Sequence, residues 1–239
     1  MLTYTSGIYQ SPLLLSKPGF VHGFSTRMFG DARVPVNAEK ILRVIRAESM
    51  HVVGVTQIHG AAVVTADGNT PRVAGDADAV VSTAKNTLLE VHVADCVPIL
   101  LVDPETRVVA AVHAGWKGTL SRIVQHTVGE MGRMGAKPSR LIAVIGPHIG
   151  MCCYTVPADR VRSFQDVFGS STEIASHWEN SWHIDLGVCN RQQLIEAGIP
   201  PAQIDSAILC TSCQIDRFYS YRKDSKETFG EIIGVIGFT

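Results

Sequence analysis

The stretch that decides the fold is VADCVPILLVDPETRVVAAVHAGWKGT, residues 93–119. Two apolar runs of strand type, 97–103 and 107–114, lie on either side of the turn residues DPET. Proline at the second position of this turn presets the backbone angle φ that a tight reversal needs. The stretch therefore predicts an antiparallel hairpin whose open end brings Cys96 close to His113.

Helical spacing is concentrated after this hairpin, whereas short strand-type runs separated by Gly, Pro, Asn and Asp come before it. The spacing predicts an amphipathic helix from about Thr119 to Gly135. A first half almost free of helices and a second half that mixes helices with strands indicate an α+β fold. Further helices are expected over 157–168 and 190–198, and further strands over 140–146, 206–212 and 231–238.

The bulk composition limits the class of protein. The chain has 239 residues, of which 46% are hydrophobic and 18% charged, with a formal net charge of -1. No linker, repeat or low-complexity tract divides it, so we expect a single domain over residues 1–239. With a net charge this close to zero, the chain has no electrostatic reason to bind nucleic acid or an anionic membrane surface, and we expect neither partner. No secretion signal or membrane-spanning stretch is recognisable and the cysteines are sparse, so we expect a cytoplasmic protein with free thiols.

Cys96 and His113 allow two chemical interpretations. They could act as nucleophile and general base, as in cysteine hydrolases. They could also bind a metal, because His59 likewise follows a strand-type run and precedes a glycine. Two imidazoles and one thiolate leave a zinc ion one open position, and the same donors suit copper. Asp95, next to Cys96, is a candidate for proton transfer.

Two other groups compete with this set. His92 lies four residues before Cys96 and would share its face on a regular strand. The segment CTSC, 210–213, is a single CxxC without a second pair and without a thioredoxin-like context, which is a weak indication of zinc binding. After the second strand of the hairpin, the glycine-bracketed turn GWKG leads into the expected helix and can present backbone donors and Lys117 to an anionic oxygen.

A series of motifs runs along nearly the whole chain. They are HGFSTR (22–27), TQIHG (56–60), DADAVVS (76–82), ADCVPILL (94–101), AAVHAGWKGT (110–119), IGPHIGMCCYTV (145–156), HIDL (183–186) and FYSYRKD (218–224). Together and in this order they resemble the YfiH-like laccase-domain family, also called multicopper polyphenol oxidoreductases and regarded as purine nucleoside phosphorylases. The resemblance implies a layered α/β/β/α domain with mixed β-sheets, similar to the catalytic domain of cytotoxic necrotizing factor.

The resemblance also implies a metal site and an activity. His59, Cys96 and His113 occupy the positions of the family's metal ligands, with zinc as the expected ion and copper as the alternative. The implied reactions are phosphorolysis of adenosine, inosine and methylthioadenosine to free base and ribose-1-phosphate, together with adenosine deamination. The expected partners are therefore purine nucleosides and phosphate, bound by a monomer or a homodimer. Arg27, Lys117 and Arg222 lie in family motifs, and we expect them to bind phosphate or substrate.

Three departures from the family pattern concern the rim of the expected pocket. The insertion after Arg27 is short, Thr155 stands where an acidic residue is usual, and Glu231 follows Gly230 where arginine is usual. Substrate preference is therefore open at this point. Two other functions also remain open: a cysteine hydrolase that uses Cys96 and His113 on amide-linked cell-wall precursors, and a copper-dependent polyphenol oxidase.

Overall fold

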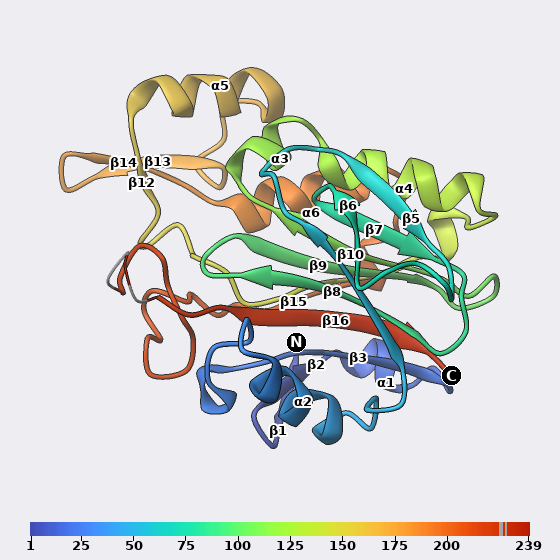
Figure 1. Cartoon of the computed structure of the whole chain (residues 1–239). Coiled ribbons are helices and arrows are strands. Elements are labelled where there is room, and N and C mark those ends of the chain that lie inside the picture. Colours follow the sequence, from blue (N-terminus) through green and yellow to red (C-terminus); the bar gives the residue numbers. More distant parts are fainter. Residues whose placement is uncertain (225–226, 228) are drawn as a thin grey trace.

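The computed structural model describes residues 1–224, 227 and 229–239. Two β-sheets lie face to face in the middle of the molecule, with helices on both outer sides (Figure 1). The first sheet has the strand order β1 (Thr3–Thr5), β2 (Ile8–Gln10), β3 (Phe20–Phe24), β16 (Ile232–Phe238), β8 (Thr87–Val93), β4 (His51–Thr56) and β6 (Val73–Asp76). The second has the order β15 (Ile204–Ser206), β11 (Ile142–Ile145), β9 (Val97–Asp103), β10 (Val108–Ala114), β7 (Ala79–Ser82) and β5 (Val63–Ala66).

The helices cover the outer faces of these sheets. On the second sheet lie α3 (Trp116–Leu120), α4 (Ile123–Arg133) and α6 (Leu186–Glu196), while α2 (Pro35–Val44) covers the first sheet and the short α1 (Pro12–Leu15) packs against β3. A third, small sheet of β12 (Thr155–Val156), β14 (Ser181–Ile184) and β13 (Ala175–Trp178) packs against α5 (Ala158–Phe168). Across residues 1–224, 227 and 229–239, no helix combines the length and apolar character that crossing a bilayer requires.

The buried side chains explain the layers. Successive residues of β9 point to opposite faces: Ile99 and Leu101 pack with the helices, whereas Leu100 and Val102 pack with the first sheet. Because both faces of the second sheet are covered, β9 and β10 are apolar at nearly every position rather than alternating. Antiparallel pairing of β9 with β10 and parallel pairing of β11 with β15 make this sheet mixed. The predicted α+β fold with layered mixed sheets is confirmed.

The predicted hairpin is also confirmed. Strands β9 and β10 pair antiparallel with His113 opposite Pro98, so the Cys96 end and the His113 end meet. At the turn, the backbone oxygen of Asp103 accepts from the N–H of Arg107 at 2.9 Å. The buried Asp103 carboxylate also pairs with Arg140 at 2.6 Å. The closed end of the hairpin is thus held by polar contacts and its open end is free to form a site.

Several predicted helix boundaries were wrong. The single helix expected from Thr119 to Gly135 is two helices, α3 and α4, because Arg122 between them adopts a left-handed conformation with φ of 58°. The side chain of Arg122 forms an ion pair of 2.8 Å with Glu196. The helix expected at 190–198 begins four residues earlier, where the side chain of Asp185 accepts from the N–H of Val188.

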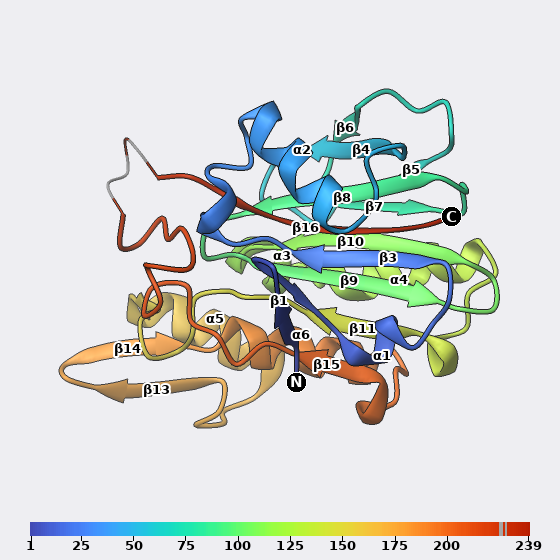
Figure 2. The ribbon, with the colours of Figure 1, turned by 90° about the horizontal axis from the view of Figure 1, so that it is seen from below.

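Two further expectations also failed. The first half is not almost free of helices, since α2 begins with Pro35 at its first turn and buries Ile41 against the first sheet. The strand expected over 206–212 ends at Ser206, and beyond it only an isolated bridge joins Cys210 to His148. Figure 2 shows the segments that follow β11 and β15 running to the same end of the sheets.

Candidate active site

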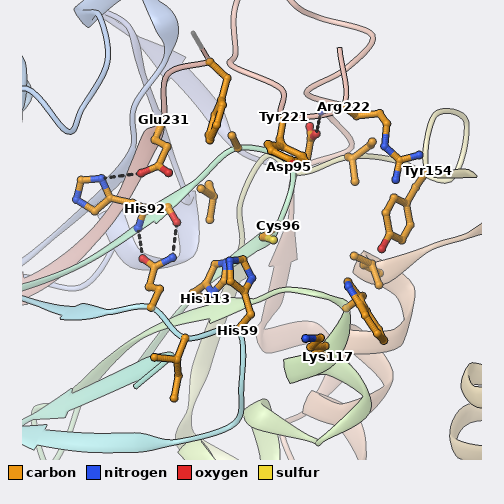
Figure 3. Close-up of a pocket in the computed structure, with 18 of the residues that line it drawn as sticks. His59, His92, Asp95, Cys96, His113, Lys117, Tyr154, Tyr221, Arg222 and Glu231 are labelled. Carbon is orange, nitrogen blue, oxygen red and sulfur yellow. Dashed lines mark hydrogen bonds and ion pairs between the residues drawn. The ribbon is translucent and has the colours of Figure 1, made fainter. Parts of the chain in front are cut away.

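Three side chains from separate segments meet at the open end of the hairpin. The ligand atoms of His59, Cys96 and His113 all lie within 4.8 Å of one another. Figure 3 shows the three side chains gathered at one point. His59 comes from the loop between β4 and β5, Cys96 directly precedes β9, and His113 is the last residue but one of β10. The histidine rings meet edge to face with their centroids 4.8 Å apart. The structure therefore brings together all three residues that the sequence singled out as metal ligands.

Gly115 is required by the close approach of this group. A Cβ atom at residue 115 would lie 3.2 Å from both the Sγ of Cys96 and the Nδ1 of His59. A larger residue would push one of these two donor atoms away from the other. The glycine of the sequence AGWKGT thus lets the turn into α3 pass directly beside the three side chains.

Asp78 organises the group from behind, and sequence reasoning missed it. Its carboxylate is fully buried and accepts from the Nδ1 of His113 at 2.8 Å. It also accepts from the backbone N–H of His59 at 3.0 Å and of Gly60 at 2.6 Å. Because a carboxylate only accepts, the proton of His113 lies on Nδ1 and leaves Nε2 as the ligand nitrogen. The only available signal was that Asp78 belongs to the motif DADAVVS.

Replacing Asp78 by asparagine is expected to weaken metal binding roughly 10- to 100-fold, the usual effect of losing such a partner. The amide NH₂ would face an N–H donor whichever way it is turned, so the orientation of His113 or of the His59 loop is lost. Zinc affinity measured by competition with a chromogenic chelator tests this. The matched control is Asp76→Asn, an exposed carboxylate of the same motif; equal affinities of the two variants would contradict the role of Asp78.

The three side chains perturb one another's pKa values. Burial alone raises the pKa of the Cys96 thiol, but His113 and then His59 outweigh it and lower that pKa from 9.0 to about 7. Burial likewise lowers the pKa of His113, but the Cys96 thiolate and Asp78 together raise it from 6.5 to about 9. A Cys96 thiolate beside a protonated His113 is thus the favoured charge state, and a metal ion would displace the proton on Nε2 of His113. Thiolate is the form of cysteine that binds metals.

A cavity of about 600 Å³ opens above this group. The aromatic side chains of Trp116 and Tyr154 line it. The cations Lys117 and Arg222 also line it, and Figure 3 shows them on different sides of the cavity. Arg160, at the start of α5, is a third cation that the sequence did not indicate; its guanidinium lies 4.1 Å from the centroid of the Trp116 ring. The cavity thus combines donor atoms, aromatic faces and positive charge.

Two of the predicted phosphate-binding cations have very different surroundings. The Nη1 of Arg222 donates to the backbone oxygen and to the hydroxyl of Thr155, both at 2.9 Å. These acceptors are neutral, so Arg222 is positioned beside the cavity without losing its net charge. Arg27 lies outside the cavity lining, where it pairs with Asp224 at 2.5 Å and donates to the backbone oxygen of Phe218.

Asp95 is held by hydrogen bonds on both carboxylate oxygens. Oδ1 accepts from the hydroxyl of Thr211 at 2.6 Å. Oδ2 accepts from the hydroxyl of Ser220 at 3.0 Å and from the N–H of Arg222 at 2.7 Å. Burial raises the pKa of Asp95, although these donors oppose the shift. The geometry favours a positioning role, in which Asp95 ties the segment of Arg222 to the loop before Cys96.

His92, the competing histidine, turns away from Cys96. Its Nε2 lies 3.0 Å from a carboxylate oxygen of Glu90 and its Nδ1 lies 3.5 Å from Glu231. Figure 3 shows the imidazole directed toward Glu231 at the side of the cavity. His92 therefore lies at the rim, and Glu231, where the family usually has arginine, adds a negative charge there.

The fold and the site together define a class of protein. It has two central β-sheets packed face to face, and two histidines and one cysteine meet at the strand ends as a candidate metal site. The chain belongs to the multi-copper polyphenol oxidoreductase laccase family, whose family model matches residues 25–239. A solved structure of YlmD from Geobacillus stearothermophilus superposes with a TM-score of 0.86 at 28% sequence identity, covering 99% of this chain and 98% of that one.

Characterised relatives carry two kinds of name. A purine nucleoside phosphorylase of Deinococcus radiodurans is 39% identical over 183 residues, which cover 77% of this chain and 68% of the relative. The adenosine deaminase RL5 of an unknown prokaryotic organism is 38% identical over 148 residues, 61% of this chain and 56% of the relative. The purine nucleoside phosphorylase YlmD of Bacillus subtilis is 36% identical, over 67% of this chain and 58% of its own length. The match to RL5 and YlmD thus spans little more than half of those proteins.

Proposed function

We propose that this chain is a metal-dependent purine nucleoside phosphorylase that also deaminates adenosine. It converts adenosine and inosine to free base and ribose-1-phosphate, and methylthioadenosine to adenine and 5-methylthioribose-1-phosphate. The observation that carries the proposal is the meeting of His59, Cys96 and His113 at the floor of a cavity lined by cations and aromatic rings. The names of the purine nucleoside phosphorylase and adenosine deaminase relatives support it.

The three donors fit a metal ion. Their ligand atoms converge, Asp78 orients His113, and the favoured charge state of Cys96 is the thiolate. Two imidazoles and one thiolate suit zinc, our first choice, and also copper. When bound, such an ion would supply Lewis-acid stabilisation of negative charge that develops on oxygen.

The cations around the cavity fit the phosphate that phosphorolysis consumes. In that reaction an oxygen of phosphate forms a bond to C1′ of the ribose while the bond from C1′ to N9 breaks, and the purine leaves with the bonding electron pair. Lys117, Arg160 and Arg222 would hold the phosphate dianion at the sugar and offset its charge. Arg222 is suited to this because its own partner, Thr155, is neutral.

The aromatic side chains fit the other half of the substrate. Trp116 and Tyr154 line the cavity beside the cations. Tyr154 is buried, so the half-buried Trp116 offers the larger aromatic surface on which a purine can stack. Arg160 already packs over one face of Trp116 and fixes that ring in place. Because the cations lie against these rings, the site can bind phosphate and base next to each other, as the reaction requires.

The test is an assay of metal-replete protein with each nucleoside, with and without phosphate, reading free base, ribose-1-phosphate and inosine together. We expect base and the corresponding sugar 1-phosphate in equal amounts and only with phosphate. Inosine should form from adenosine with or without phosphate. Neither base nor inosine above the level of a protein-free sample would contradict the proposal.

A cysteine hydrolase is the second candidate, because the thiol of Cys96 and the imidazole of His113 are close enough to act as nucleophile and base. Treatment with a metal chelator distinguishes the two functions. A cysteine hydrolase keeps its activity in the presence of a chelator, whereas the metal-dependent phosphorylase loses it and recovers it when zinc is added back.

A further inference from the structure

Four cysteines from two distant segments form a second group of donor atoms. Cys152 and Cys153 lie in the turn between β11 and β12, and Cys210 and Cys213 lie in the segment after β15. Their four Sγ atoms all lie within 4.8 Å of one another. The CxxC that lacked a partner in the sequence thus meets the adjacent pair of cysteines in space.

The sulfur separations suit one metal ion held by four thiolates. The Sγ of Cys213 lies 3.5 Å from that of Cys152 and 3.4 Å from that of Cys153. In a tetrahedral zinc tetrathiolate, with Zn–S bonds of about 2.3 Å, neighbouring sulfurs lie about 3.8 Å apart. Cys213 is about equally close to two other thiols. A single disulfide would use only two of the four sulfurs and would not explain why the other two lie beside them.

The backbone is already arranged around the group. The N–H of Gly150 and the N–H of Cys213 both donate to the Sγ of Cys210, at 3.2 and 3.4 Å. Such bonds stabilise the thiolate form that a metal requires. A Cβ at residue 150 would lie 3.3 Å from both the Sγ of Cys152 and the Cβ of Cys210, so a larger side chain would press on two of the cysteines. The turn at 151–153 also lets the two adjacent cysteines reach the same point, which an extended strand would not.

We propose that Cys152, Cys153, Cys210 and Cys213 bind a structural zinc ion, separate from the group of His59, Cys96 and His113. Four protein thiolates fill the coordination sphere of zinc, which is the arrangement of structural rather than catalytic sites.

The position of this site gives the ion a role. Cys153 directly precedes Tyr154, which lines the cavity, and Cys210 and Cys213 flank Thr211, which donates to Asp95. Zinc would therefore join the segment that carries Tyr154 to the segment that holds Asp95, and would fix both beside the cavity.

The experiment measures zinc per chain and the spectrum of the cobalt-substituted protein. The compared proteins are the unaltered chain, Cys210→Ser/Cys213→Ser, and the control Cys189→Ala, which removes a buried thiol outside both groups. We expect the double variant to lose one zinc per chain and the visible and near-ultraviolet bands of tetrahedral cobalt with four thiolates, and the control to keep both. Equal zinc contents, or cobalt bands without tetrathiolate character in the unaltered chain, would overturn the inference.

Two further measurements remain decisive if the double variant does not fold. The single variant Cys213→Ser changes an exposed residue and should also lose the tetrathiolate spectrum. In the unaltered chain, zinc should protect the four thiols from maleimide until a chelator is added. Free reaction of these thiols in the zinc-loaded protein would overturn the inference. None of these readouts depends on nucleoside turnover, so the proposed function and this site can fail independently.

Discussion

Replacing Cys96 by alanine is expected to lower kcat/KM for nucleoside phosphorolysis by at least about a thousandfold, the scale typical of losing a central member of a catalytic group. The variant removes the only sulfur among the three donors at the floor of the cavity. It also removes the negative charge that, with Asp78, raises the pKa of His113. The measurement is steady-state phosphorolysis of inosine by protein dialysed against zinc.

The control for this prediction is again Cys189→Ala, which deletes a thiol buried in α6 far from the three donors in the sequence. Like Cys96→Ala, this variant lacks one cysteine, but it should retain the kcat/KM of the unaltered chain. If Cys96→Ala stayed within about tenfold of the control, a loss of under roughly 1.4 kcal/mol, Cys96 would lie outside the reacting site. The metal content of both variants shows whether the loss of activity follows the loss of the ion.

The convergence of the three donors could be anticipated because most of it is local. The turn DPET and the two apolar runs around it set the pairing of β9 with β10, which brings Cys96 to His113. His59 joins them from a different part of the chain, and only its position at the end of a strand-type run and the resemblance to known motifs indicated it. Local pattern thus accounts for two donors and motif similarity for the third.

The features that escaped prediction depend on contacts between distant segments. Nothing in the local pattern distinguishes Asp78 from Asp76 in DADAVVS, yet one carboxylate is buried under the donors and the other is exposed. Arg160 enters the cavity only because α5 packs over α3. The break between α3 and α4 lies at Arg122, whose side chain pairs with Glu196 of the distant α6. Each of these three residues makes contacts with distant segments, which the hydrophobic periodicity of the sequence does not reveal.

The four-cysteine group illustrates the same limit. A single CxxC carries little information about zinc, because its second pair can lie anywhere in the chain. Here the second pair is two adjacent cysteines in a turn, a spacing that no zinc-binding pattern in the sequence would select. Parallel pairing of β11 with β15 sends the two segments to the same end of the sheet and brings the sulfurs together.

Removing the side chain of Asp95 is expected to lower kcat/KM at least about 100-fold, the cost of displacing groups that position a substrate. Three donors from the segment 211–222 meet its two oxygens, so this carboxylate holds the loops on either side of the cavity. Glycine is the suitable replacement, because Asp95 has φ of 85° and alanine would be strained there. The loss should be larger in kcat/KM than in kcat, since Arg222 would move from the phosphate.

Asparagine at the same position separates positioning from proton transfer. Turned with its oxygen toward Ser220 and Arg222, the amide keeps both of their bonds, and its NH₂ can donate to the hydroxyl of Thr211 once that hydroxyl rotates. Asp95→Asn should therefore retain activity within about tenfold of the unaltered chain, the scale of one weakened hydrogen bond. A proton-transferring carboxylate would lose its function in both variants. Equal losses of phosphorolysis and deamination in Asp95→Asn and Asp95→Gly would thus assign Asp95 to proton transfer, whereas rescue by asparagine assigns it to holding the wall of the cavity in place.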